Sequence, residues 1–346
     1  MMKRTLKTFS AIIVSAVMVS GLSASGEDRA VGGGQAFPPV RLSPAMPAEF
    51  PLTLSEMRVR DPFILADKAT STYYLYAQHG NRLNNDRVGT GVEVYRSKNL
   101  INWSKPETVF QRPAENFWGG VDIWAPEVHK LGNEYLMFVS FPGRDGGRGT
   151  QILRAPKPEG PFVLAGEGAN TPPEQRSLDG TPWIEADGSH WLVYCHEWSQ
   201  VHDGVVRAVQ MTKDWTARQG ESVQLFKASE VPWVRSIGEA NGKNNYVTDG
   251  PFLYRTKDGK LLMIWSSFRK GGDYAVGMVE SESGTVKGPW RHSPEPFFPD
   301  NGGHGMIFRD FSGNLLLALH QPNHGTSERL RLLKLKEENG SLVVDK

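Results

Sequence analysis

Cysteine, unbalanced charge and long apolar runs are all scarce in this sequence. The single cysteine, Cys195, excludes an intramolecular disulfide, and its apolar surroundings predict a buried, inert thiol. The chain has 39 Lys and Arg against 38 Asp and Glu, so its charge indicates neither a nucleic-acid nor a membrane partner. The sustained apolar spacing of amphipathic helices is also missing, which favours an all-β protein of short strands and turns.

The N-terminal residues are typical of an export signal. Three basic residues precede an apolar stretch at 11–19, and small residues follow at 23–26. The apolar stretch is too short to span a bilayer comfortably. We therefore expect a signal peptide at 1–25 and a Gly- and Pro-rich extended arm or linker at 26–54. The mature protein is expected in the periplasm or the medium, as a monomer without membrane insertion.

A short pattern recurs five times along the rest of the chain. Each copy is an apolar run, a polar turn and a second apolar run, as in a β-hairpin. The copies are anchored 55 to 69 residues apart, at Pro62, Pro126, Pro182, Pro251 and Met306. Each interval has room for one or two further strands, such as 91–95 or 275–279. Repeated four-stranded sheets at this period predict a single-domain, five-bladed β-propeller over residues 55–346.

Three aspartates stand at or just before these anchors. Asp61 opens the first copy, Asp179 precedes the third and Asp249 precedes the fourth. The inner strands of a propeller start around one central channel, so we expect the three carboxylates to meet there. Clustered carboxylates suit cleavage of a glycosidic bond, because one ionised group activates water while a protonated one donates to the leaving oxygen.

At this point the sequence resembles glycoside hydrolase family 43, five-bladed propellers that act on arabinose- and xylose-containing polysaccharides. The resemblance covers roughly residues 55 to 335 and is strongest in a set of spaced motifs. These are Arg60-Asp61-Pro62-Phe63, Trp124-Ala125-Pro126-Glu127-Val128, Leu178-Asp179-Gly180, Asp249-Gly250-Pro251 and Gly303-His304-Gly305-Met306-Ile307-Phe308.

The resemblance implies an inverting mechanism, with Asp61 as general base and Asp179 as the residue that tunes and orients the acid. The third position departs from the family pattern, since Asp249 stands where the family usually has glutamate. Its carboxyl falls about 1–1.5 Å short if the backbone is unchanged. Three alternatives follow: Asp249 still serves as acid, Glu197 or Glu230 donates instead, or the site binds sugar with little turnover.

Other residues are candidates for binding. Trp124, Glu197 and Trp198 are predicted to line the sugar site, and the resemblance adds Arg329. It also places His304 in the central channel, near either a bound calcium ion or a water-filled site, with a structural hydrogen bond as the alternative role. Trp233 is a further candidate for the cleft.

The predicted function is therefore an exported, inverting glycoside hydrolase for arabinose- or xylose-type polysaccharides or oligosaccharides. Its expected type is an α-L-arabinofuranosidase, endo-arabinanase or β-xylosidase. The alternatives are a non-catalytic carbohydrate-binding propeller and a hydrolase for another furanoside, such as a galactofuranoside.

Overall fold

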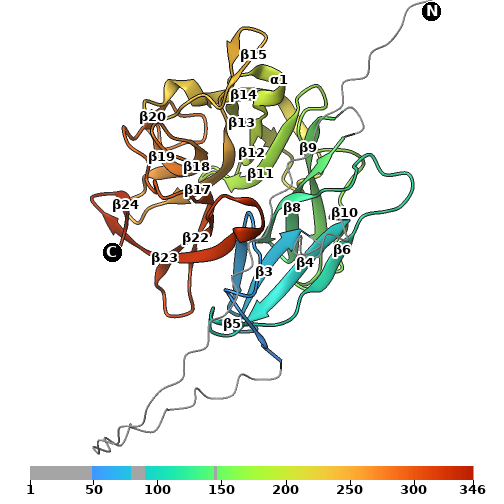
Figure 1. Ribbon diagram of the computed structural model, residues 1–346. Coiled ribbons are helices and arrows are strands. Elements are labelled where there is room, and N and C mark those ends of the chain that lie inside the picture. Colours follow the sequence, from blue (N-terminus) through green and yellow to red (C-terminus); the bar gives the residue numbers. More distant parts are fainter. Residues whose placement is uncertain (1–48, 79–89, 144–145, 346) are drawn as a thin grey trace, which may run out of the picture. The chain divides into compact units, whose positions relative to one another are not determined.

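The computed structural model describes residues 49–78, 90–143 and 146–345 (Figure 1). The predicted signal peptide and most of the predicted arm lie outside the described residues. Contacts divide the chain into Met1–Ala45 and Met46–Lys346, and the fold described below is that of the second unit. Its first strand, β1 (Leu52–Thr53), pairs with a strand of the first sheet although it falls within the segment predicted as an arm.

Five antiparallel sheets follow one another along the chain. The first contains β1 with β2 (Phe63–Asp67), β3 (Thr72–Gln78), β4 (Gly91–Ser97), β5 (Asn102–Trp103) and β6 (Glu107–Gln111). The second contains β7 (Trp124–Leu131), β8 (Glu134–Pro142), β9 (Arg148–Ala155) and β10 (Val163–Leu164). The third contains β11 (Ser177–Ile184), β12 (His190–His196), β13 (Val205–Met211) and β14 (Arg218–Lys227).

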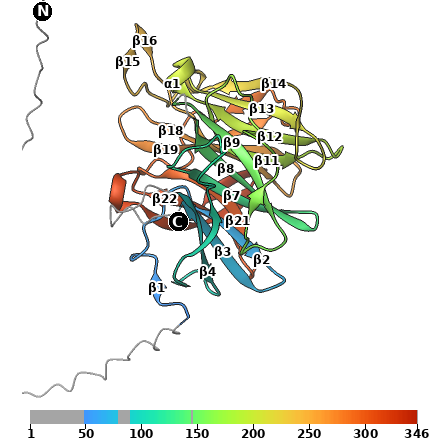
Figure 2. The ribbon, with the colours of Figure 1, turned by 90° about the vertical axis from the view of Figure 1, so that its right-hand side faces the viewer.

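The last two sheets repeat this plan. The fourth contains β17 (Asp249–Arg255), β18 (Leu261–Phe268), β19 (Tyr274–Ser281) and β20 (Trp290–His292), and the fifth contains β21 (Gly303–Arg309), β22 (Leu315–Gln321), β23 (Arg329–Glu338) and β24 (Ser341–Val344). A separate hairpin of β15 (Glu239–Ala240) and β16 (Lys243–Asn244) projects from the sheets (Figure 2). Among the described residues, α1 (Trp198–Val201) is the one α-helix, and no helix is long and apolar enough to cross a membrane.

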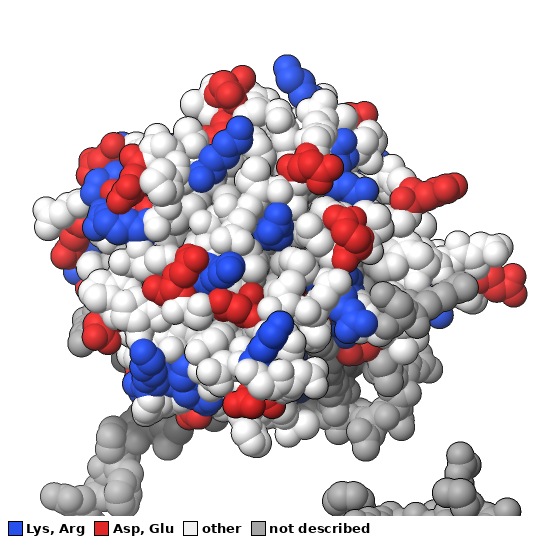
Figure 3. Space-filling view, turned by 90° about the horizontal axis from the view of Figure 1, so that it is seen from above, with Lys and Arg blue, Asp and Glu red and all other residues white. Residues whose placement is uncertain are grey.

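The five sheets close into a ring through their innermost strands. β2 contacts β7, β7 contacts β11, β11 contacts β17, β17 contacts β21, and β21 returns to β2. The structure therefore confirms the predicted five-bladed propeller, with one sheet as each blade. On the face seen in Figure 3, acidic and basic side chains are interspersed, as the balanced composition predicts.

Each inner strand carries the same irregularity near its start. The pairing register shifts between Trp124 and Glu127, Leu178 and Thr181, Asp249 and Phe252, and Gly303 and Met306. In each bulge the residue directly after the first of these two has a positive φ. Asp61, just before β2, has the same conformation. The five residues with positive φ are Asp61, Ala125, Asp179, Gly250 and His304. A β-bulge redirects the side chain at which it occurs. The propeller thus repeats one local backbone conformation, which sets the direction of one residue in each blade.

The bulges correct the alignment of the repeats that the sequence suggested. Counted from each left-handed residue, Pro62, Pro126 and Pro251 are equivalent, as predicted. Their counterparts in the other two blades are Gly180 and Gly305, rather than Pro182 and Met306. Proline and glycine both occur where a strand bulges or bends sharply. Because glycine takes this position in blades 3 and 5, an alignment on proline misplaces these two copies.

Aromatic side chains fill the middle of the ring. The ring of Phe63 in blade 1 lies 4.7 Å from that of His129 in blade 2 and 6.5 Å from that of Phe252 in blade 4. These contacts join inner strands of three blades, so they close the axis beneath the start of the strands. Cys195 on β12 is buried, and burial raises the pKa of its thiol well above the usual value, in agreement with an inert thiol.

Candidate active site

All five blades contribute to one small pocket at the starts of their inner strands. Its volume is about 140 Å3. It is lined by Arg60 and Asp61 of blade 1, Trp124 of blade 2, Leu178 and Asp179 of blade 3, Asp249 of blade 4 and His304 of blade 5. Five of these residues, Asp61, Trp124, Asp179, Asp249 and His304, were named from the sequence as site residues. Arg60 and Leu178 stand in the motifs but were not singled out.

Asp61 is held from both sides. One oxygen, Oδ1, lies 3.2 Å from His304 Nδ1 and 3.3 Å from His320 Nδ1. The other, Oδ2, lies 3.5 Å from Arg60 Nε. Burial raises the pKa of the carboxyl, but the nearby His304, Arg60 and His320 outweigh it, so the pKa lies well below its usual value. Asp61 is therefore ionised over the whole physiological pH range.

Asp179 and His304 lie beside it. Asp179 Oδ2 is 3.7 Å from His304 Nδ1 and accepts a 2.9 Å hydrogen bond from the backbone N–H of Gly250. Burial, together with the charges of Asp249 and Asp61, raises the pKa of Asp179 despite the opposing effect of His304. Burial lowers the pKa of His304, but the three carboxylates outweigh it and the pKa is raised above the usual value. The three carboxylates therefore favour the protonated form of His304.

Asp249 approaches from the other side with a partner of its own. Its Oδ2 accepts a 2.8 Å hydrogen bond from the hydroxyl of Tyr274, which is buried on β19. Burial raises the pKa of Asp249, while the hydrogen bond from Tyr274 and the charges of His304 and Arg60 oppose it. The pKa of Asp249 is raised overall, whereas the pKa of Asp61 in the same pocket is lowered. No motif in the sequence marks Tyr274, which lies 25 residues from its partner.

A buried ion cluster supports Arg60. Glu328, whose side chain is 1% exposed, accepts from Arg58 through Oε2 and from Arg60 Nη1 at 2.6 Å through Oε1. Arg60 Nη1 also donates to Asn323 Oδ1 at 2.9 Å, and that oxygen lies 3.1 Å from His320 Nε2. The backbone N–H of Asp61 donates to His320 Nδ1 at 3.3 Å. The first and last blades are thus joined by the same groups that surround Asp61.

Trp124 lies in the pocket wall, as predicted. The guanidinium carbon of Arg148 stands 3.2 Å over its ring, and Arg148 donates to the carboxylate of Asp122 at 2.8 Å. Glu197, half-buried at the end of β12, is close enough to Asp249 for that charge to act on it. Burial, helped by Asp249, raises the pKa of Glu197, and Arg148 opposes this. Trp124 and Glu197 therefore both flank the acidic pocket.

Three other predicted residues lie elsewhere. Glu230 is exposed, and its carboxylate accepts from the backbone N–H of Lys227 at 3.1 Å in a turn after the outermost strand of blade 3. It therefore cannot serve as the acid in this pocket. Trp233 is buried against Trp265, with 5.6 Å between ring centroids, so it belongs to the core. Trp198 begins α1 and does not line the acidic pocket.

Arg329 is also absent from the pocket lining. Its Nε donates to the carbonyl of Ser55 at 3.0 Å, and its Nη1 donates to the carbonyls of Thr326 and Glu328 at 2.9 and 2.8 Å. These contacts tie the N-terminal segment to blade 5. Arg329 therefore helps to close the ring, and the prediction that it contacts sugar has no support from its position.

The surroundings of His304 do not fit a calcium site. Calcium prefers a shell of six to eight oxygen ligands. His304 Nδ1 lies 3.2 Å from Asp61 Oδ1 and 3.7 Å from Asp179 Oδ2 instead, so these carboxylate oxygens face the imidazole. Within the described ranges, no three His, Cys, Asp or Glu side chains are arranged to hold a metal. Calcium beside His304 stays a prediction, and none of the chemistry below depends on it.

Comparisons with known proteins agree with this geometry. The model of the family described as glycosyl hydrolases family 43 matches residues 53–337. A solved endo-arabinase from Bacteroides thetaiotaomicron is 42% identical, with a TM-score of 0.76 over 84% of this chain and 99% of its own.

Two curated relatives are more distant. An extracellular exo-α-(1→5)-L-arabinofuranosidase from Streptomyces chartreusis is 28% identical over 52% of this chain and 54% of its own length. An α-L-arabinofuranosidase from Humicola insolens is 26% identical over 57% of this chain and 40% of its own length. The chain thus spans about half or less of these curated relatives. The family match covers most of this chain, however, and a ring of five blades with clustered aspartates at its centre accompanies it. The protein therefore belongs to glycosyl hydrolases family 43.

Proposed function

We propose that this chain hydrolyses arabinofuranosyl linkages in arabinose-containing polysaccharides or oligosaccharides, with inversion at the anomeric carbon. The observation that carries this is the opposite direction of the pKa shifts of Asp61 and Asp249 in one pocket. Titratable groups whose environments push their pKa values apart are the mark of an acid and base pair. The endo-arabinase and the two arabinofuranosidases support arabinose over xylose as the sugar.

The proposed reaction is a single displacement. Ionised Asp61 takes a proton from water, and the water oxygen attacks the anomeric carbon from the face opposite the leaving group. As the glycosidic bond breaks, protonated Asp249 gives its proton to the leaving oxygen. Asp61 ends neutral and Asp249 ends ionised, and exchange with solvent restores both. Inverting enzymes hold the two carboxyl groups about 6.5–9.5 Å apart so that water fits between them.

Asp249 is the better donor than Asp179, although the pKa of both is raised. Asp179 is 5% exposed and one of its oxygens is bound to the N–H of Gly250. Asp249 is half-buried, so its carboxyl is more open to a leaving group. Asp179 and His304 then act through charge: His304 lowers the pKa of Asp61, and the charge of Asp249 raises the pKa of Asp179. Glu197 remains the alternative donor because it lies near Asp249 and its pKa is also raised.

We further infer that the mature protein works outside the cytoplasm, in the periplasm or the medium. The composition of residues 1–25 supports this, as does the extracellular location named for the Streptomyces chartreusis relative.

The test compares wild type with Asp61→Asn, Asp249→Asn and Glu197→Gln. The substrates are nitrophenyl α-L-arabinofuranoside, β-D-xyloside and β-D-galactofuranoside, and linear arabinan. Asp61→Asn should lose at least about a thousandfold in kcat on the arabinose substrates while its melting temperature changes little. Asp249→Asn should lose most on arabinan, because an alkoxide leaving group needs protonation more than nitrophenolate does.

Each alternative has its own outcome. If Glu197→Gln shows the leaving-group dependence and Asp249→Asn does not, Glu197 is the acid. Activity on the xyloside or galactofuranoside alone would replace arabinose as the sugar. Sugar binding by wild type without product release would make the chain a binding propeller.

A further inference from the structure

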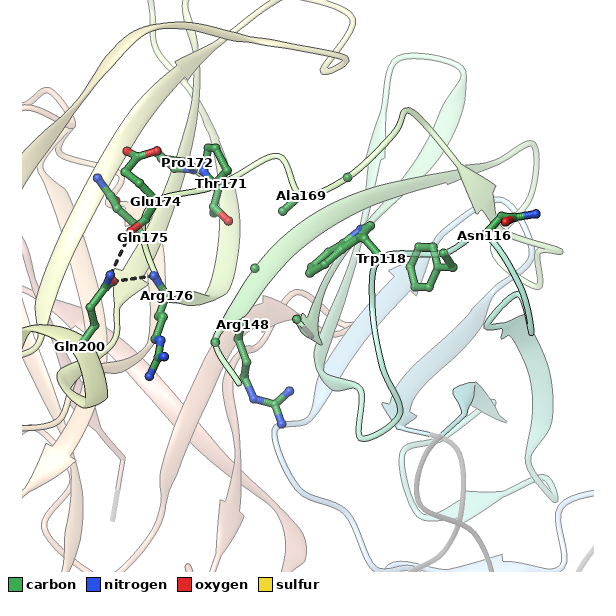
Figure 4. A pocket seen from close by; sticks show the side chains of 16 residues that line it. Asn116, Trp118, Arg148, Ala169, Thr171, Pro172, Glu174, Gln175, Arg176 and Gln200 are labelled. Carbon is green, nitrogen blue, oxygen red and sulfur yellow. Dashed lines mark hydrogen bonds between the residues drawn. The ribbon is translucent and has the colours of Figure 1, made fainter. Parts of the chain in front are cut away.

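A second cavity lies between blades 2 and 3, beside the acidic pocket. Its volume is about 670 Å3, within the range of about 300–1,000 Å3 usual for ligand sites. One side is built from segment 116–118 and the start of β9, and the other from segment 171–176 and Gln200. Figure 4 shows Trp118 across the cavity from Gln175, Arg176 and Gln200. None of the residues named above as catalytic or sugar-binding candidates lines it.

Trp118 presents a fixed aromatic ring to this cavity. Its indole N–H donates to Gln151 Oε1 at 2.7 Å, and its ring meets that of Phe141 edge-on at 5.9 Å. Gly149 lets the ring lie close to β9, since a Cβ there would stand 3.2 Å from the indole Cη2 and 2.7 Å from the Cβ of Ala169. The side chain is nevertheless only half-buried. A large ring held in place with an open surface offers stacking area at little entropic cost.

The opposite wall is polar and equally fixed. Gln175 accepts from the hydroxyl of Tyr194 at 2.7 Å and donates to Ser222 at 3.2 Å. Gln200 accepts from the backbone N–H of Arg176 at 2.7 Å and donates to the carbonyl of Glu174 at 3.0 Å. An aromatic surface facing amide and guanidinium groups suits a sugar, which has apolar ring faces and hydroxyl edges.

The cavity adjoins the acidic pocket, and Arg148 and Trp124 meet where the two come together. Arg148 lines the cavity, and its guanidinium carbon lies 3.2 Å over the ring of Trp124 in the pocket wall. The charge of Arg148 is met by Asp122 at 2.8 Å, which argues against an anionic ligand. The acidic pocket, at about 140 Å3, has room for one small ring. The rest of a bound chain must therefore lie outside this pocket, and the neighbouring cavity begins where Arg148 meets Trp124.

From this proximity we propose that the cavity binds the neutral pentose residues that adjoin the scissile bond in a longer substrate, with one sugar stacked on Trp118. The inference rests on the proposed hydrolysis of arabinofuranosyl linkages and adds to it a preference for oligosaccharides. Trp118 is then a specificity-determining residue, because it touches the substrate without touching the reacting atoms.

The experiment measures kcat and KM for wild type, Trp118→Ala and Trp118→Phe. The substrates are nitrophenyl α-L-arabinofuranoside, which carries a single sugar, and arabinofuranosyl oligosaccharides of increasing length. Trp118→Ala should lose about tenfold or more in kcat/KM on the longer oligosaccharides, mainly through KM. The loss on the nitrophenyl glycoside should stay within about twofold. Trp118→Phe should recover part of the oligosaccharide activity.

A matched control is Trp183→Ala, which removes another half-buried tryptophan at the far end of β11. Any change that Trp183→Ala makes in kcat/KM should be the same on the nitrophenyl glycoside and on the oligosaccharides. Affinity electrophoresis in linear arabinan is run in parallel for all variants.

The outcomes separate this inference from the proposed function. An equal loss on both substrate types for Trp118→Ala, or no loss on any, would overturn the subsite. If wild type hydrolyses none of the substrates, the proposed function fails, and electrophoresis then decides the inference alone. Retardation by arabinan that Trp118→Ala abolishes would support a sugar site in the cavity. Retardation unchanged by the substitution, or absent in wild type, would refute it.

Discussion

The hydrogen bond from Tyr274 to Asp249 sets the acidity of the proposed acid. The carboxyl is buried enough to have a raised pKa, and the phenol donates to its ionised form at 2.8 Å. A hydrogen bond to the charged form lowers a pKa, so Tyr274 keeps Asp249 less basic than burial alone would. The phenol also fixes one carboxyl oxygen, which leaves the other for the substrate. We regard Tyr274 as a positioning residue.

Tyr274→Phe should therefore raise the pKa of Asp249. The alkaline limb of the pH profile of kcat/KM reports loss of the acid's proton, so it should move to higher pH, by about one unit. Acidic residues that interact titrate together, so the limb belongs to the Asp179 and Asp249 pair. The measurement is kcat/KM for nitrophenyl α-L-arabinofuranoside from acid to alkaline pH.

The control is Tyr254→Phe, which removes a hydroxyl that donates to Glu337 at 2.6 Å in the outer part of the propeller. Its pH profile should match that of wild type. An alkaline limb that stays in place, or moves to lower pH, in Tyr274→Phe would show that the phenol does not govern the acid.

At the scale of the element, the repeated bulge brings the site together. Asp61, Asp179 and His304 occupy the left-handed position of blades 1, 3 and 5, and their side chains meet within 4 Å of one imidazole nitrogen. In blade 4 the same position is Gly250, and the carboxylate comes one residue earlier, at Asp249. A non-glycine residue with positive φ is costly, and such strain concentrates at functional sites. The glycine leaves space for the ring of His304.

Gly250→Ala tests this packing. The residue has φ of +49°, and a Cβ would stand 2.8 Å from two ring atoms of His304. We expect a loss of unfolding free energy beyond the about 1–2 kcal/mol that positive φ alone costs, together with a fall in kcat, because His304 must shift.

Gly259→Ala is the control, since its φ is +83° and nothing lies within 4 Å of its Cβ position. Thermal and urea unfolding measure stability, and nitrophenyl glycoside hydrolysis measures kcat. Equal stability losses with unchanged kcat in both variants would contradict a packing role for Gly250.

At the scale of the whole molecule, the closing contact of the ring also supports the base. Glu328 binds Arg58 and Arg60, the backbone N–H of Val59 donates to the carbonyl of Glu328 at 3.3 Å, and Arg60 lies against Asp61. These groups come from opposite ends of the described chain. The contacts that join the first and last blades therefore also hold the Arg60 guanidinium beside Asp61.

Glu328→Ala should cost about 3–5 kcal/mol of unfolding free energy, because it leaves two buried or half-buried guanidinium groups without their carboxylate. Activity should fall as well, since Arg60 loses the contact that holds it beside Asp61. Urea unfolding and kcat measure the two effects.

Glu280→Ala is the comparison, because Glu280 pairs with Arg291 at 2.6 Å and Lys260 at 3.3 Å near the surface. It should cost less than about 1 kcal/mol and leave kcat unchanged. Similar losses of stability in the two variants would mean that the buried cluster contributes no more than a surface pair.

The sequence by itself determined the fold class, the number of blades and the family. Hairpin patterns are local, so alternating apolar runs and turn residues specify them without knowledge of distant contacts. Five copies at a propeller period then specify the ring. Asp61, Asp179 and Asp249 could be singled out because each stands within three residues before an anchor of the repeated motif.

Only the tertiary structure decided which side chains meet at the centre. The exact register of the bulges was hidden in blades 3 and 5, where glycine replaces proline. The partners Tyr274 for Asp249 and Glu328 for Arg60 are far from them in sequence, and no local pattern marks such pairs. Glu230, Trp233 and Arg329 had suitable chemistry but lie in a turn, in the core and at the ring closure. A side chain acts where the packed blades place it, and that placement depends on contacts between strands that sequence periodicity does not encode.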